Sequence, residues 1–172
     1  MIVNCQLLRK CGGFSVAKIM AIEFVYWDSD AFLGWLQAEP GKAELCAGTL
    51  RRADQGEVLI LTSTLTIAEV LWMRGAPMIP QEKAEIVRKF FRRSYMRMRN
   101  VTRAISESAQ DLVWNHNIKP KDAIHVATAL DATVFALETF DDGLLNKTGK
   151  IGSPSLVIRK PLAPAQRGLF DG

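Results

Sequence analysis

Short apolar segments that look like strands alternate with segments that look like helices, and this alternation restricts the possible folds more than any other feature. Residues 23–27, EFVYW, and 57–62, EVLILT, are rich in the aromatic and β-branched residues that buried strands favour. Three further strands are expected over residues 95–101, 133–140 and 155–161. Because the strands are separated by helices, we predict an α/β fold, a three-layer α/β/α sandwich around a mostly parallel sheet.

The helix-like segments carry recognisable start and stop signals. Thr102 and Pro120 are residue types that begin helices, and Gly56 is the type that ends one. Either Asp28 or Asp30 can cap the helix that follows the first strand. Helices are expected over residues 31–37, 41–56, 63–74, 81–94, 102–117 and 119–132.

Composition excludes several classes of protein. With 172 residues, of which 48% are hydrophobic, the chain can form one domain with a substantial core. It has no apolar run near the roughly 20 residues that span a bilayer, so we expect no membrane association and a cytoplasmic protein. Cys5, Cys11 and Cys46 lack CxxC spacing, which argues against a disulfide framework or a zinc site. The net charge of +4 permits an anionic partner.

The chain divides into three parts. Residues 1–20 show little periodicity and are expected to form an N-terminal extension outside the core. The alternating elements predict a single domain over residues 21–160. Residues 161–172 are expected to form a C-terminal tail.

Four acidic residues occupy positions where an α/β protein places its chemistry. Asp28 and Asp141 each follow a strand, so they are expected at the same edge of a parallel sheet. Asp122 opens a helix, and Glu69 lies among apolar residues in the helix after the second strand. Each aspartate could instead be an ordinary cap or first-turn acid, and Glu69 could face solvent. Their shared position favours a common site.

If these carboxylates converge, a cation is needed between them. Two like charges about 4 Å apart repel by roughly 4 kcal/mol at an effective dielectric constant of 20. An oxygen-only set of ligands suits Mg²⁺ or Mn²⁺ better than zinc. His125, three residues after Asp122, is expected to pack or hydrogen-bond near the site and not to act as a base.

The four acidic segments together resemble the signature blocks of the PIN-domain nucleases, and especially of the VapC-type toxins of toxin–antitoxin pairs. The blocks are VYWDSDAFL, TSTLTIAEV, KPKDAIHVATAL and ETFDDGLL, and the resemblance covers residues 22–160. It implies an endoribonuclease in which Asp28, Glu69, Asp122 and Asp141 bind Mg²⁺ or Mn²⁺, and in which a metal-activated water cleaves RNA. It also gives secondary site positions at Asp30 and Thr139.

The resemblance further implies partners. These are an RNA substrate, a small antitoxin protein and a second copy of the chain, because PIN toxins commonly pair. Leu33, Trp35 and Leu36 look like exposed apolar residues for a homodimer. The alternatives are an RNA-processing PIN nuclease without an antitoxin, a catalytically inactive PIN-like binding module, and a receiver-like signalling domain. The last needs a phosphoacceptor Asp at a mid-chain strand end, where this chain has Thr62.

A basic segment is the candidate for RNA contact. Residues 88–103 hold seven basic residues and no acidic one, with aromatic residues among them. Such a surface can follow a nucleic-acid backbone and stack bases. Alternatively, the aromatic residues belong to the core and the arginines form the wet face of an outer strand. The predicted RNA-binding residues are Arg88, Lys89, Arg92, Arg93, Arg97 and Arg99.

Overall fold

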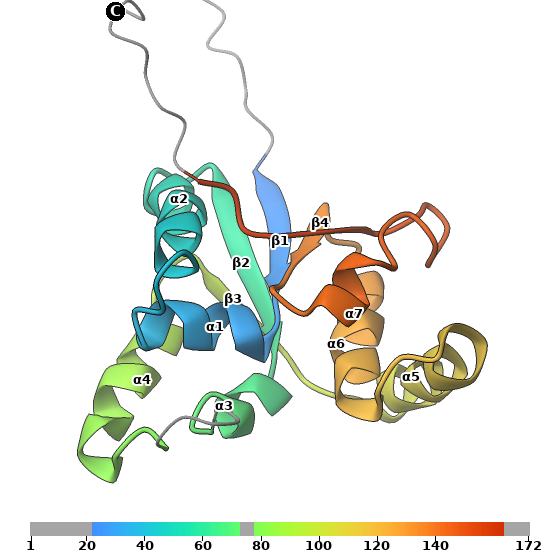
Figure 1. Ribbon diagram of the computed structural model, residues 1–172, viewed down its shortest axis with the longest axis horizontal. Helices are drawn as coiled ribbons and strands as arrows, with labels where there is room; N and C mark the ends of the chain where they lie inside the picture. Colours follow the sequence, from blue (N-terminus) through green and yellow to red (C-terminus); the bar gives the residue numbers. More distant parts are fainter. Residues whose placement is uncertain (1–21, 73–77, 164–172) are drawn as a thin grey trace, which may run out of the picture.

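The computed structural model describes residues 22–72 and 78–163, so the expected extension over residues 1–20 lies outside the described residues. At its centre is a five-stranded sheet in the order β3-β2-β1-β4-β5, in which every neighbouring pair is parallel (Figure 1). The strands are β1 (Glu23–Trp27), β2 (Val58–Ser63), β3 (Met96–Arg99), β4 (Ala136–Glu138) and β5 (Val157–Arg159).

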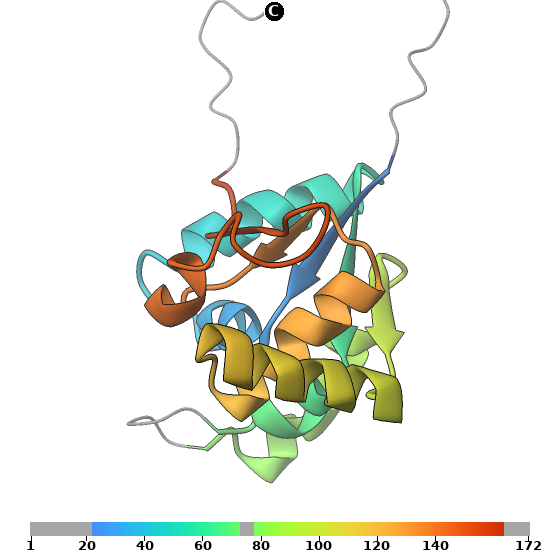
Figure 2. The same ribbon diagram turned by 90° about the vertical axis from the view of Figure 1, so that its right-hand side faces the viewer.

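Helices cover both faces of this sheet. Helices α5 and α6 lie together on one face, and α1 and α2 lie on the other, as Figures 1 and 2 show. The predicted α/β/α sandwich is therefore confirmed. The helices are α1 (Ser29–Leu36), α2 (Ala43–Asp54), α3 (Leu65–Glu69), α4 (Ala84–Phe91), α5 (Arg103–His116), α6 (Pro120–Asp131) and α7 (Asp142–Leu145), with a 3-10 turn η1 (Gln81–Lys83) before α4.

Alternating side chains of β1 supply the two cores. Val25 and Trp27 point to the face covered by α1, α2 and α4, where Trp27 packs edge-on against Phe32. Tyr26 points to the opposite face, among the buried residues of α5 and α6. Since β1 is central and buried on both faces, its sequence is apolar throughout, as parallel strands require. The following residue, Asp28, emerges at the carboxyl edge of the sheet.

The helix signals in the sequence correspond to observed caps. Thr102 caps α5 by accepting a hydrogen bond from the backbone N–H of Ile105, and Pro120 is the first residue of α6. Gly56 has a φ of +76°, the left-handed conformation that allows the chain to turn after α2. These local signals therefore set the positions from which the acidic residues project.

Several element boundaries differ from the sequence-based expectations. The helix expected over residues 63–74 is only the five-residue α3, and residues 73–77 lie outside the described residues. The strand expected over 133–140 is reduced to β4, because Thr133 turns the chain with a φ of 51°. Leu33 is buried, so its expected exposure on a dimer surface is wrong. No helix in the described ranges is long and apolar enough to cross a membrane.

Candidate functional site

Asp28 and Asp141 are joined through Thr139 at the carboxyl ends of the neighbouring strands β1 and β4. The Thr139 hydroxyl donates to Oδ2 of Asp28 over 2.5 Å and accepts from the backbone N–H of Asp141 over 3.0 Å. Both aspartates also cap helices, since Asp28 accepts from the N–H of Ala31 and Asp141 from that of Leu144. The capping role and a role in a site are therefore compatible.

Burial makes the Asp28 carboxyl unusually easy to protonate. Only 4% of the residue is exposed, and this burial, reinforced by the negative charge of Asp30, raises the pKa of Asp28 to about 6. The charge of His125 and the hydrogen bonds from Thr139 and the backbone of Ala31 oppose the rise in pKa. A divalent cation near this carboxyl would favour its ionised form.

Glu69 lies at the end of α3 with 11% of its side chain exposed. Its Oε2 lies 2.7 Å from Nε2 of His125, and its Oε1 lies 3.4 Å from Nζ of Lys121. Burial raises the pKa of Glu69, but these hydrogen bonds and charges together outweigh burial and hold the pKa below its ordinary value. The apolar neighbours of Glu69 in the sequence gave no sign of either basic partner.

Asp122 is half-buried in the first turn of α6. Burial raises its pKa, and the negative charges of Asp141 and Glu69 add to the rise, while Lys119 and His125 oppose it. Asp122 is therefore close enough to two other acidic residues of the predicted set to interact with their charges. These carboxylates concentrate negative charge at one end of the sheet.

The secondary position Asp30 is tied to a lysine. Its Oδ1 lies 2.9 Å from Nζ of Lys42, which also pairs with Glu39 over 3.1 Å. Sequence reasoning did not identify Lys42, because it comes from the turn before α2 and belongs to none of the four acidic blocks. Thr139, the other secondary position, contacts Asp28 and Asp141 directly.

The donor set was tested against the metal that the fold family implies. Carboxylate and hydroxyl oxygens are the ligands that Mg²⁺ and Mn²⁺ prefer. Over residues 22–72 and 78–163, no three His, Cys, Asp or Glu side chains form a ready-made metal cluster. Mg²⁺ is usually held by one or two carboxylates, with water and substrate phosphates completing its coordination. The donor chemistry at Asp28, Asp122 and Asp141 therefore fits such an ion.

The basic residues of α4 and β3 are exposed, but several have acidic partners. Arg92 lies 3.5 Å from Glu85, and Arg99 lies 2.8 Å from Asp131 on an exposed surface. Arg93 donates to the Tyr95 hydroxyl. The exposed basic residues are Arg88, Lys89, Arg92, Arg93, Arg97 and Arg99.

The aromatic residues of the basic segment belong mainly to the core. Phe90 and Tyr95 are each 5% exposed, and Phe90 packs against Phe32. Neither can stack on a base without leaving the core. Any RNA contact by this segment therefore depends on its positive charges.

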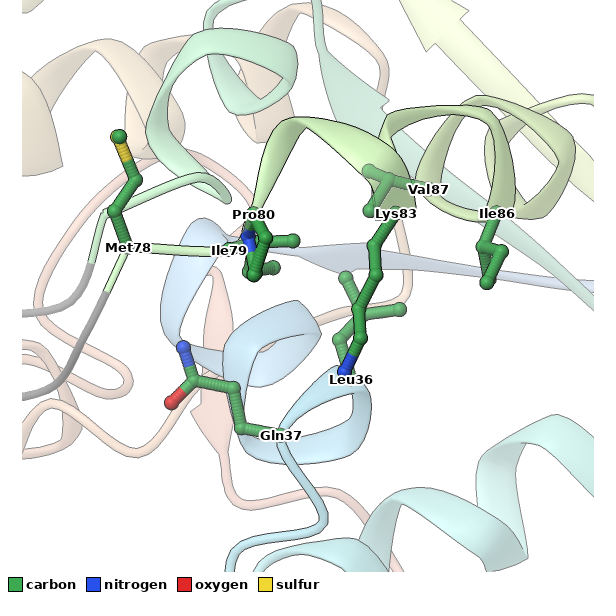
Figure 3. A pocket seen from close by; sticks show the side chains of 8 residues that line it. All are labelled: Leu36, Gln37, Met78, Ile79, Pro80, Lys83, Ile86 and Val87. Atoms are coloured by element: carbon green, nitrogen blue, oxygen red, sulfur yellow. The ribbon is translucent and has the colours of Figure 1, made fainter.

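An apolar cavity of about 340 Å³ opens away from the carboxylates (Figure 3). Its lining comes from the end of α1, from the segment before η1 and from α4, and Ile86 and Met78 are strongly exposed beside it. None of the four predicted acidic site residues lines this cavity. The lining residues are Leu36, Gln37, Met78, Ile79, Pro80, Lys83, Ile86 and Val87.

A five-stranded parallel sheet with acidic residues at the ends of its central strands defines the class of protein. The family model described as PIN domain matches residues 25–150. The chain therefore belongs to the PIN-domain family, as its sequence motifs predicted.

Among solved structures, the chain is similar in fold to the crystal structure of Mycobacterium tuberculosis VapC20, a toxin that cleaves the sarcin-ricin loop. The TM-score is 0.54 at 18% sequence identity, and the match covers 71% of this chain and 94% of that chain. No curated protein sequence matches the chain.

Proposed function

We propose that the protein is a metal-dependent endoribonuclease and the toxin of a toxin–antitoxin pair. The observation that carries this proposal is the linkage of Asp28 and Asp141 through Thr139 at the carboxyl edge of β1 and β4. Membership of the PIN-domain family and the fold similarity to VapC20 support it. The intact acidic set argues against a catalytically inactive binding module.

In this proposal, Asp28, Glu69, Asp122 and Asp141 hold Mg²⁺ or Mn²⁺. A bound divalent ion supplies a Lewis acid for the scissile phosphate and a water of lowered pKa. Thr139 orients Asp28 by hydrogen bonding to one of its oxygens. The ammonium groups of Lys119 and Lys121 lie near the acids and can attract the RNA phosphates.

An RNA cleavage assay tests this function. The purified protein is incubated with total RNA in Mg²⁺, in Mn²⁺ and in excess EDTA. We expect cleavage only with metal, and its loss in the Asp28→Asn variant. Asp111→Asn is the matched control, because Asp111 is an exposed residue of α5 outside the acidic set, and it should remain active. Full activity in EDTA would contradict the metal mechanism.

The antitoxin is the second part of the proposal. The apolar cavity between α1 and α4 is bordered by Lys83 and by the basic residues of α4, so it suits an apolar segment with acidic flanks. We propose that the antitoxin binds there, in the cytoplasm where the RNA substrate is made. Co-expression of the adjacent small gene with wild type and with Ile86→Glu tests this. We expect the substitution to abolish co-purification, and unchanged co-purification would place the contact elsewhere.

A further inference from the structure

His125 joins three elements of the fold through its two ring nitrogens. It comes from α6 and is only 2% exposed. Its Nδ1 lies 2.8 Å from the hydroxyl of Tyr26 on β1, and its Nε2 lies 2.7 Å from Oε2 of Glu69 on α3. Because both nitrogens are engaged and the ring is buried, His125 is unsuited to exchange protons with a substrate. Its geometry is that of a residue that holds another in place.

The direction of the hydrogen bonds follows from the partners. A carboxylate oxygen only accepts, so Nε2 of His125 must carry the hydrogen that is shared with Glu69. The Tyr26 hydroxyl can donate to an unprotonated Nδ1 or accept from a protonated one. Tyr26 is fully buried, and its ring meets the imidazole edge-on with centroids 5.9 Å apart. Tyr26 is thus compatible only with rings that keep the hydrogen on Nε2 when neutral.

Glu69 depends on this contact because little else restrains it. Helix α3 has five residues and ends at Glu69. Among the described residues, the carboxylate has two partners, His125 and Lys121. The Lys121 side chain is 74% exposed, and ion pairs to such solvated groups contribute little. The buried bond to His125 is therefore the main restraint on the carboxylate.

We propose that His125 is a positioning residue for Glu69 and that Tyr26 fixes the imidazole in the orientation required. This inference rests on the proposed function, in which Glu69 helps to hold the divalent ion. Hydrogen-bonding partners of metal-ligating carboxylates typically change metal affinity by about 10–100-fold when they are removed. Neither Tyr26 nor His125 touches the substrate in this account.

Mn²⁺ affinity, measured by calorimetric titration, tests the proposal without relying on catalysis. We expect Mn²⁺ to bind His125→Leu about 10–100-fold more weakly, because leucine offers no donor to Glu69. His125→Gln should recover part of the affinity, since its amide can still donate. Tyr26→Phe should fall between wild type and His125→Leu while keeping the volume of the ring. His116→Gln, at the chain's only other histidine, should bind as wild type does.

Two results would overturn the proposal alone. One is unchanged Mn²⁺ affinity in folded His125→Leu and Tyr26→Phe when wild type binds the ion. The other is an NMR spectrum of ¹⁵N-labelled His116→Gln in which the remaining histidine carries its hydrogen on Nδ1 and not on Nε2. A wild-type protein that binds no Mn²⁺ would instead contradict both the proposed function and the positioning role. The state of folding of each variant is checked by its thermal melting curve.

Discussion

Replacing Glu138 should destabilise the protein more than replacing any exposed acid. Glu138 is completely buried on β4. Its Oε2 accepts from the indole of Trp27 and from the hydroxyl of Thr49, each over 2.8 Å, and its Oε1 lies 3.0 Å from Arg159. These contacts bind β4 to β1, α2 and β5, directly before Thr139 reaches Asp28. The carboxylate therefore fixes the strand that supports the site.

The magnitude follows from the groups that would lose a partner. In Glu138→Ala, two buried donors lose their acceptor, at about 1–3 kcal/mol each. Arg159 loses one carboxylate but keeps Glu23 at 3.2 Å and is 22% exposed, so solvent reduces its cost. We therefore expect a loss of about 3–5 kcal/mol, the usual cost of breaking a buried pair. Glu138→Gln should lose about 1–3 kcal/mol, because its amide oxygen still accepts.

Urea unfolding, followed by fluorescence, measures these changes in the free energy of unfolding. Glu107→Ala is the matched control, because Glu107 pairs with Arg103 on the surface, where the two side chains are 59% and 91% exposed. That control should change stability by no more than about 0.5 kcal/mol. If Glu138→Ala and Glu107→Ala destabilise the protein equally, the buried network does not hold β4 as argued.

Three further predictions concern other parts of the molecule. Ala38 has a φ of 52°, so Ala38→Gly should raise the free energy of unfolding by up to about 1 kcal/mol in the same urea assay, and a loss would contradict the strain. Arg92→Ala with Arg93→Ala should weaken RNA binding in an Asp28→Asn background and flatten its salt dependence, which falls by about 0.7 log unit per phosphate contact; identical slopes would exclude these arginines. Light scattering should give twice the 19.1 kDa mass of one chain, and a monomer at micromolar concentration would contradict a homodimer.

The sequence predicted the layers of the fold because its strongest signals are local. The β1 segment is buried on both faces, and Thr102, Pro120 and Gly56 begin or end helices through contacts with their own neighbours. The parallel order of the strands follows from the helical crossovers between them. Short elements were less accessible, since α7 has only four residues and β4 only three.

The site was only partly accessible from the sequence for the same reason. Asp28 and Asp141 were predicted together because each follows a strand, and their link through Thr139 agrees with that position. The partners of Glu69 could not be found this way, since His125 lies 56 residues further along the chain. The contact between Tyr26 and His125 spans 99 residues and has no local signature. Such pairs are fixed by packing rather than by spacing.

The most direct test of the proposed metal mechanism replaces one non-bridging oxygen of the scissile RNA phosphate by sulfur, after the cleavage site has been mapped. Mg²⁺ binds sulfur poorly, whereas softer ions such as Mn²⁺ and Cd²⁺ accept it. We predict that one phosphorothioate diastereomer is cut much more slowly than the normal RNA in Mg²⁺, and that Mn²⁺ or Cd²⁺ restores its cleavage. Equal cleavage of both diastereomers and of the normal RNA in Mg²⁺ would contradict a metal ion that contacts the phosphate at the carboxylate edge.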